Sequence, residues 1–411
     1  MVGLSGVRSD FMPFLQAAAE RHCWPCGVPA LNSDERREAR RTRRAEKRQR
    51  NRGSRIEGLD IEAVADLNAL YRAAMQAGRG VSWKASIQRY QKDVLKNIVR
   101  TRRDILDGND LHRGFINFDI VERGKRRHIS SVHIAERVPQ KALAQEVLIP
   151  ATVPTVIGAN SANIKGRGTD YAVRLMKRHL AEHYRRHGAE GYILQMDFRD
   201  YFARIAHEPL KRQLASRLDD EKVLSLAESF IDVQGDIGLG LGSEPNQICA
   251  VAFPNAIDHF VTEMCGVEAY GRYMDDSYCI HTSKEHLVMV KSAVEILCGD
   301  YGIELHPRKT QIVKLSHGFT FLKKKFFYSE TGRVIVRPCR DTITRERRKL
   351  KALKRMLDSG DITMEQIEQQ YQSWRGGLVH LDAHDTLLSM DALYRDLFKG
   401  SLNGNPPRND N

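Results

Sequence analysis

Two short segments, 191–205 and 270–280, place aspartates where apolar strands end or turn. The first, GYILQMDFRDYFARI, begins as a short buried strand that delivers Asp197 at its end. The second, YGRYMDDSYCI, has apolar or aromatic flanks around Asp275 and Asp276, the pattern of a hairpin with two carboxylates at its bend. Neighbouring carboxylates repel one another unless cations neutralise them. The pattern therefore predicts an oxygen-rich site for two Mg²⁺ ions, as in nucleotidyl transfer, although an isolated Asp-Asp pair is usually a solvated turn.

The charge of the whole chain indicates a polyanionic partner. Lys and Arg exceed Asp and Glu by +13 over 411 residues, which favours nucleic acid through counterion release. The seven cysteines fall mostly in apolar runs, which predicts a reducing, cytoplasmic setting rather than a disulfide framework. No apolar run has the length of a membrane span, and the first residues lack the order of a signal peptide, so we expect no membrane partner.

The elements around the aspartates alternate between helices and hairpins. Apolar residues recur at helical spacing over residues 61–77 and 83–106. Residues 113–132 alternate apolar and polar side chains around an Arg-Gly-Lys turn, which predicts a β-hairpin with a basic tip. Residues 136–153 read as helical around their prolines, and a further long helix is expected over 171–188, ending at a glycine.

The N-terminal region carries two features that could bind a ligand. Residues 34–55 hold eleven basic and four acidic residues, a net of +7, which suits an RNA-contacting arm. A solvated charged helix is the alternative. The pair Cys23 and Cys26 forms a single CxxC, and the sequence leaves open whether it binds a metal.

The aspartate segments resemble the catalytic motifs of reverse transcriptases. Residues 273–276, YMDD, resemble the catalytic hairpin of that family, and Asp197 with Phe202 five residues later resembles its first catalytic motif. Between them, GLGLGSEPNQ at 238–247 resembles the motif that packs under the template base, where glycines let the backbone approach a nucleotide.

Further motifs follow in the family's order. Downstream, GIELHPRKTQIV resembles the segment whose lysine, here Lys309, faces the leaving pyrophosphate, and GFTFLKKKFF resembles the primer-grip hairpin. Upstream, RHI at 127–129 and ERVPQ at 136–140 resemble the fingers motif that clamps the triphosphate, and IKGRG resembles the next fingers motif. The resemblance covers roughly residues 80–398, and seven motifs in order make it specific.

The resemblance implies an α+β, right-hand polymerase with fingers, a palm of antiparallel sheet and helices, and a helical thumb. The expected divisions are a basic N-terminal extension at 1–60, N-terminal helices and fingers at 61–190, palm at 191–338, thumb at 339–398 and a disordered tail at 399–411. In the thumb we expect about three helices, with Tyr371 and Trp374 as core residues rather than base-stacking ones.

The resemblance also implies roles for individual residues. The catalytic carboxylates are Asp197, Asp275 and Asp276, and the metal ligands are these three with Phe198. Contacts to the dNTP are expected from Arg127, Arg137, Lys165, Phe202, Leu241, Gly242 and Lys309, and contacts to nucleic acid from Arg43, Arg44, Arg48, Tyr273, Arg345 and Arg348. The cofactor is Mg²⁺, two ions per site, with Mn²⁺ as the alternative.

The chain departs from the retroviral and intron-encoded pattern at informative places. Leu241 stands where those enzymes have the Gln of Pro-Gln-Gly. The segment Gly-x-x-x-Asn-Gln at 242–247 most resembles the Gly-x-x-x-Ser-Gln of diversity-generating retroelement enzymes and related domesticated bacterial reverse transcriptases, with Asn246 in place of the serine. Lys323 replaces the glycine of the primer-grip motif. Phe202 is expected to exclude ribonucleotides by its bulk, whereas Asp200 keeps an RNA-dependent RNA polymerase as the alternative.

These observations predict RNA-templated DNA synthesis from dNTPs, on a dedicated noncoding RNA in antiviral defence. The short stretch after Phe398 led us to expect no nuclease or DNA-binding domain. A diversity-generating element that makes mutagenic cDNA is the alternative, and a noncatalytic RNA-binding scaffold is the rival from another class. The template, the primer, an accessory protein and a homo-oligomer stay open.

Overall fold

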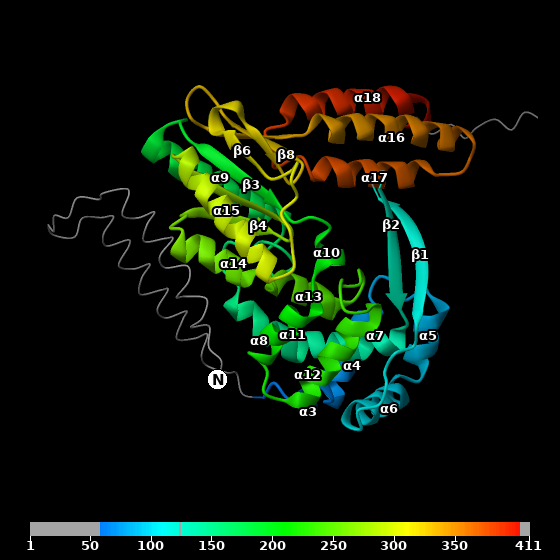
Figure 1. The fold of residues 1–411 in the computed structure, drawn as a ribbon. Coiled ribbons are helices and arrows are strands. Elements are labelled where there is room, and N and C mark those ends of the chain that lie inside the picture. Colours follow the sequence, from blue (N-terminus) through cyan, green and yellow to red (C-terminus); the bar gives the residue numbers. More distant parts are fainter. Residues whose placement is uncertain (1–57, 123–124, 403–411) are drawn as a thin grey trace, which may run out of the picture. The chain divides into compact units, whose positions relative to one another are not determined.

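A four-stranded antiparallel sheet carries both aspartate segments. The computed structural model describes residues 58–122 and 125–402, and in it the strands lie in the order β4-β5-β3-β6 (Figure 1). The strands are β3 (Tyr192–Asp197), β4 (Ala269–Tyr273), β5 (Asp276–His281) and β6 (Gln311–Lys314). The predicted strand before Asp197 and the predicted hairpin around Asp275 are thus confirmed.

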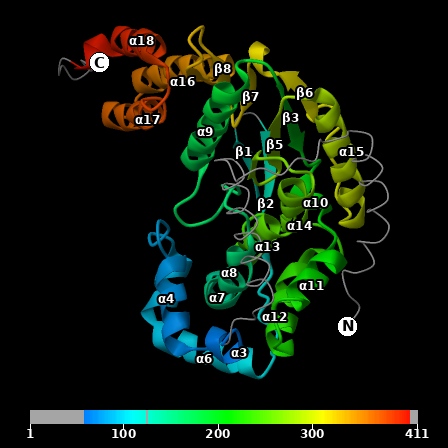
Figure 2. The same ribbon diagram turned by 90° about the vertical axis from the view of Figure 1, so that its left-hand side faces the viewer.

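The two faces of this sheet pack against different helices (Figure 2). Leu194 and Met196 of β3 belong to a large core that also holds the apolar side of α15 (Lys284–Asp300). Ile193, the residue before Leu194, belongs to a second core with α9 (Thr169–His187). Because side chains alternate along a strand, Asp197 points to the same face as Ile193.

Two smaller antiparallel sheets complete the strand content of the described residues. The hairpin of β1 (Phe115–Glu122) and β2 (Lys125–Val132) confirms the expectation for residues 113–132. The second sheet has the order β7-β8-β9, with strands Phe319–Phe321, Lys324–Tyr328 and Val334–Pro338. Gln195 Nε2 donates to Thr320 O at 2.6 Å, which ties the carboxylate-bearing face of β3 to β7.

The first helices are shorter than the apolar periodicity predicted. The segment 61–77 divides into α3 (Ile61–Val64) and α4 (Leu67–Ala77), because Asp66 accepts a hydrogen bond from Ala69 N at 2.8 Å and caps a new helix. The segment 83–106 likewise divides at an aspartate, into α5 (Ala85–Lys92) and α6 (Val94–Leu106).

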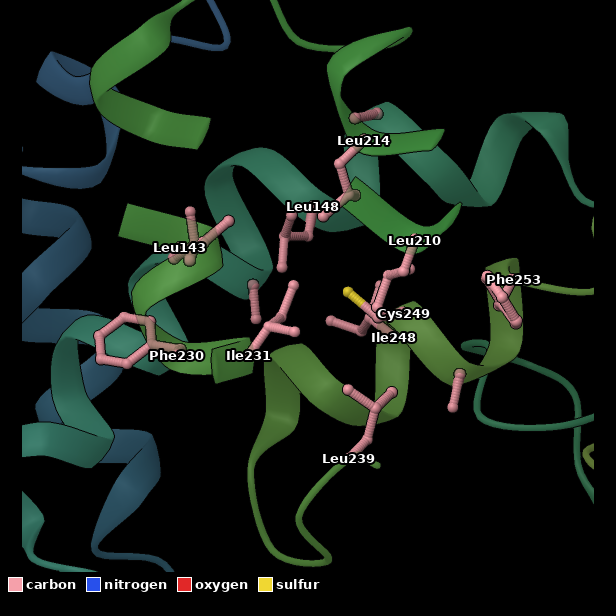
Figure 3. Close-up of a cluster of buried hydrophobic side chains, with 14 of the residues drawn as sticks. Leu143, Leu148, Leu210, Leu214, Phe230, Ile231, Leu239, Ile248, Cys249 and Phe253 are labelled. Carbon is pink, nitrogen blue, oxygen red and sulfur yellow. The ribbon is translucent and has the colours of Figure 1, made fainter. Parts of the chain in front are cut away.

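Helices between the sheets form the large core. The elements between β2 and β3 are α7 (Ile134–Leu143), a π-helical turn (Ala144–Leu148), α8 (Ile149–Thr152), a 3₁₀ turn (Val153–Thr155) and α9. Those between β3 and β4 are α10 (Tyr201–Arg204), α11 (His207–Ala215), α12 (Glu221–Ile231), a 3₁₀ turn (Asp232–Gln234), α13 (Glu244–Ala252), α14 (Asn255–His259) and a π-helical turn (Phe260–Met264). Figure 3 shows Leu143, Leu210, Ile231 and Ile248 meeting in this core.

Three helices follow β9, as expected, and build a third core. They are α16 (Arg340–Asp358), α17 (Met364–Gly376) and α18 (His384–Leu402). Tyr371 is buried and stacks on Tyr394 at a centroid distance of 4.3 Å, which confirms that it is a core residue. Trp374 is half-buried and packs against the same cluster. Before α18, Asp382 accepts a hydrogen bond from Val336 N at 2.9 Å, which ties this helical part to β9. In the described part of the chain no helix combines the length and apolarity needed to cross a membrane.

Candidate active site

The two aspartate segments meet at one end of the four-stranded sheet. Asp197, the last residue of β3, pairs directly with Asp276, the first residue of β5. Met274 and Asp275 form the turn between β4 and β5, and Met274 has a left-handed backbone with φ of 55°. Phe198 N donates to Asp275 O at 3.2 Å and fixes the turn against the end of β3. The register therefore brings together the three carboxylates that the sequence singled out.

The crowding of these carboxylates is visible in their electrostatics. Burial, the charges of Asp275 and Asp197, and a hydrogen bond to Asp197 raise the pKa of Asp276 from 3.8 to about 7. Like charges opposite one another on a sheet are destabilising. Positive charge at this position would therefore relieve a real repulsion.

The loop between α15 and β6 supplies one positive charge. Lys309 Nζ donates to Asp197 Oδ1 at 2.8 Å and to Oδ2 at 3.0 Å. Burial acts to lower the pKa of Lys309, but the hydrogen bond and charge of Asp197 raise it on balance. His306 N also donates to Asp197 O at 2.7 Å, so this loop binds both the backbone and the side chain of the aspartate. The contact between Lys309 and Asp197 had no local sequence signal, because 112 residues separate them.

The donor set fits hard divalent cations. In residues 58–122 and 125–402, no group of three or more His, Cys, Asp or Glu side chains is arranged so that it could hold a metal ion by itself. Mg²⁺ is usually held by one or two carboxylates, with substrate phosphates and waters completing its shell. Asp197 and Asp276 face each other, and Asp275 lies in the β4-β5 turn immediately before Asp276, so the three carboxylates match such an open site.

The glycine-rich segment lies against Phe202 and the β1-β2 hairpin. Leu239 N donates to Phe202 O at 2.7 Å. A Cβ on Gly238 would lie 3.1 Å from Ala203 O, and its φ of 94° is one that other residues rarely adopt. A Cβ on Gly242 would lie 3.4 Å from Ser130 O of β2. The glycines thus allow close backbone contacts, while Leu241 beside them is half-buried.

A cavity of about 540 Å³ opens beside this segment. It brings together two residues that the sequence predicted, Arg137 on α7 and Gly242 before α13. Three more lining residues, Gln140, Glu244 and Gln247, lie inside the quoted motifs without a role assigned to them. The remaining lining residues were missed, and they are Gln76, Ala77, Lys141, Ile149, Asn163 and Ile248. The sequence did offer a signal for part of this lining, because polar residues follow both predicted residues closely: Gln140 and Lys141 after Arg137, and Glu244 and Gln247 after Gly242.

The remaining predicted residues are more scattered. Arg137 Nη2 donates to Ser131 Oγ at 3.0 Å, and Lys165 is exposed on the loop before α9. Arg345 and Arg348 are exposed on α16, and Tyr273 is half-buried against the second core. The side chain of Arg127, together with Arg43, Arg44, Arg48, Cys23 and Cys26, lies outside what the structure describes.

Comparison with known proteins places the chain in a family. The family "Reverse transcriptase (RNA-dependent DNA polymerase)" matches residues 117–326, more than half of the chain, which include the three carboxylates and Lys309. The chain therefore belongs to the reverse transcriptase family, an RNA-directed DNA polymerase family with an α+β fold. Family members act on an RNA template with nucleotide substrates and generally use divalent metal. No curated protein matches the chain.

Solved telomerase structures show a more distant similarity. Telomerase from Candida albicans, in complex with a TWJ fragment of telomeric RNA, is 12% identical over 69% of this chain and 53% of that one, with a TM-score of 0.44. Apo telomerase from Candida tropicalis, truncated from its C-terminal domain, is 14% identical over 55% of this chain and 54% of that one, with a TM-score of 0.43. The chain thus spans about half the length of the telomerase chains it matches.

Proposed function

We propose that the site at the end of β3 joins a primer 3′-hydroxyl to the α-phosphate of a dNTP opposite an RNA template. One observation carries this proposal, the direct pairing of Asp197 with Asp276 beside the turn that holds Asp275. These carboxylates, with Phe198 next to them, would hold two Mg²⁺ ions. When bound, the ions supply positive charge at the attacking and leaving oxygens of the displacement.

The other residues of the site have roles that fit their positions. Lys309 is the cation nearest the carboxylates and would face the leaving pyrophosphate. Arg137 lines the cavity beside Gly242, where a guanidinium fork can bind phosphate oxygens, and Arg127 and Lys165 would add further charge. The cavity would take the template nucleotide, which the resemblance places above Gly242. Phe202 would exclude a ribose 2′-hydroxyl.

The division of the chain follows the same proposal. Residues 61–190 would form N-terminal helices and fingers, 191–338 the palm and 339–398 the thumb. The exposed basic side chains of α16, including Arg345 and Arg348, would bind the phosphates of the template-primer duplex without reading its sequence.

The experiment is primer extension on a primed RNA template with Asp275→Asn. We expect incorporation to be abolished with the fold intact, because a carboxylate that would hold Mg²⁺ is lost, and with it the positive charge that would neutralise the transferring phosphoryl group. Asp200→Asn is the matched control. Asp200 lies three residues after Asp197, its side chain is 73% exposed, and asparagine tolerates its left-handed backbone of φ 46°. Wild-type rates for Asp275→Asn would refute the site assignment, and loss of dNTP use by Asp200→Asn would count against it.

We also propose that the template is a dedicated noncoding RNA used in antiviral defence. The net charge of +13 and the basic segment 34–55 support a stable RNA partner, and the resemblance to domesticated bacterial reverse transcriptases supports defence. A diversity-generating element is the second candidate, favoured by the Gly-x-x-x-Asn-Gln spacing at 242–247.

Sequencing the nucleic acid that copurifies with the full chain separates these roles. One abundant noncoding RNA with matching cDNA supports the first candidate, and cDNA with clustered substitutions supports the second. Copurified RNA without any cDNA would favour the noncatalytic scaffold. Deleting residues 34–55 should weaken RNA binding and flatten its salt dependence, and an unchanged slope would mean that the segment makes no phosphate contacts.

A further inference from the structure

A buried ion pair joins β4 to α14. Arg272 is the largest fully buried side chain of the described residues, and its partner Asp258 on α14 is equally inaccessible, each side chain being 0% exposed. Arg272 Nε donates to Asp258 Oδ1 at 2.8 Å and to Oδ2 at 3.0 Å, and Nη2 donates to Oδ2 at 2.8 Å. Burying two charges is expensive, and apolar residues of similar volume often stabilise a fold as well. Fold stability alone therefore gives a weak reason for this pair.

The same guanidinium also holds backbone carbonyls. Nη1 donates to Met274 O at 3.0 Å, and Nη2 donates to Val251 O of α13 at 2.8 Å. Met274 is the left-handed residue of the turn and immediately precedes Asp275. One side chain thus links the turn directly to α13 and α14.

The backbone of Arg272 extends this connection to the loop before α9. Ser161 N donates to Arg272 O at 2.8 Å, and Arg272 N donates to Ala159 O at 3.1 Å. Lys165 lies four residues further along this loop, and Arg167 closes the loop by donating to Asn160 O at 2.6 Å. One residue of β4 therefore joins the carboxylate turn to the loop that carries Lys165.

We propose that Arg272, with its charge balanced by Asp258, is a positioning residue that fixes the Met274–Asp275 turn for catalysis. This inference rests on the proposed role of Asp275 and Asp276. A planar guanidinium can donate to Asp258, Val251 and Met274 at once, whereas a lysine ammonium on a flexible stem cannot match the same fork. Loss of the bond to Met274 O lets the turn shift, and small shifts of reacting groups lower the rate strongly.

The test is steady-state and burst kinetics of Arg272→Lys on a primed RNA template. Lysine keeps a positive charge for Asp258, so the variant retains the buried ion pair but loses the bond to the turn. We expect kcat to fall by about ten- to a hundredfold, with the dNTP KM and the melting temperature little changed. Arg375→Lys is the matched control, because Arg375 pairs with Asp391 between α17 and α18, and its kcat should stay at the wild-type value.

A second variant keeps the inference testable if Arg272→Lys does not fold. Arg272→Met with Asp258→Asn removes both charges together, and the asparagine oxygen can still accept the hydrogen bond that Tyr270 Oη donates to Asp258 Oδ1 at 2.6 Å. The same fall in kcat is expected. Wild-type kcat in either folded variant would overturn the inference, as would a burst amplitude that falls while the active molecules turn over at the wild-type rate.

Asp275→Asn, measured alongside, tests the catalytic site separately from the role of Arg272. Activity in Asp275→Asn would refute the catalytic site itself. An inactive Asp275→Asn together with a fully active Arg272→Lys would refute only the role of Arg272.

Discussion

Gly271 is the position where one added methyl group should disturb the site most. It pairs with Tyr278 across β4 and β5, one residue before Arg272. A Cβ at Gly271 would lie 2.6 Å from Tyr278 Cε1 and 2.7 Å from both Cζ and Oη, whereas real Cβ contacts essentially never fall under 3.0 Å. The ring or the strand must therefore move in Gly271→Ala.

The Tyr278 ring has little room to yield. It is 1% exposed, its hydroxyl lies 3.0 Å from His179 Nδ1, and its centroid lies 5.2 Å from that of Phe321. Overpacking a rigid core site costs about 1–3 kcal/mol. At roughly 2–4 °C per kcal/mol for domains of 150–250 residues, Gly271→Ala should lower the melting temperature by several degrees, measured by calorimetry or circular dichroism.

The control for Gly271→Ala is Gly299→Ala in α15. A Cβ at Gly299 meets nothing within 4 Å. Alanine is favoured over glycine in a helix by up to about 1 kcal/mol, so this variant should melt at or above the wild-type temperature. Both variants add the same methyl group, but Gly271→Ala should lower the melting temperature and Gly299→Ala should not. If Gly271→Ala melted at or above the wild-type temperature, the argument that Tyr278 cannot move would be wrong.

Two further predictions concern the sugar and the pH. Phe202→Ala should incorporate ribonucleotides, because the bulk of the Phe202 ring is what we expect to exclude the ribose 2′-hydroxyl. Equal use of dNTPs and rNTPs by the wild type in primer extension would show that Phe202 is only a core residue. Burial, aided by the charge of Arg178, lowers the pKa of His179 from 6.5 to about 4, so protons bind the unfolded chain more tightly than the folded one. The free energy of unfolding is therefore unaffected by His179 above pH 6.5, and it should fall by about 3 kcal/mol as the pH falls from 6.5 to 4. Urea titrations at several pH values should show this dependence of the unfolding free energy on pH in the wild type and a weaker one in His179→Gln. The same dependence in both proteins would refute the lowered pKa of His179.

Local patterns predicted where the carboxylates lie, because Asp197 ends a short apolar strand, and Asp275 and Asp276 lie at the turn of a hairpin whose apolar flanks are visible in the sequence. The antiparallel register then follows from packing, since a slip of one residue would move Asp197 to the opposite face. The helix divisions were missed, although Asp66 was a readable cap signal. Lys323 shows a different limit of the sequence, because it stands where the family motif has glycine and nevertheless has a left-handed backbone, with a φ of 59°.

The ion pair of Arg272 and Asp258 was also missed, for a physical reason. Propensity and periodicity describe each element by itself, and the pair joins β4 to α14 through contacts that only tertiary packing creates. A signal was nevertheless present. An aspartate inside the apolar helix PNAIDHFV and an arginine inside a buried strand are each costly alone, so the two together suggest a pair.

The contact between Lys309 and Asp197 leads to a prediction with opposite effects on metal binding and rate. Lys309 Nζ bonds both carboxylate oxygens of Asp197, so a cation that binds this aspartate must share it with the ammonium group. The Lys309 side chain is 54% exposed, which limits the pair to about 1 kcal/mol. Lys309→Met should therefore lower the Mg²⁺ concentration for half-maximal activity by up to about fivefold.

The same change should reduce the maximal rate, because it removes a positive charge that we place opposite the developing pyrophosphate. Mg²⁺ titrations of primer extension measure both quantities in one experiment. Lys314→Met, at an exposed position at the end of β6, is the matched control and should change neither. A higher Mg²⁺ requirement in Lys309→Met would mean that the lysine orients Asp197 for the metal rather than competing with it. An unchanged maximal rate would remove Lys309 from the catalytic machinery.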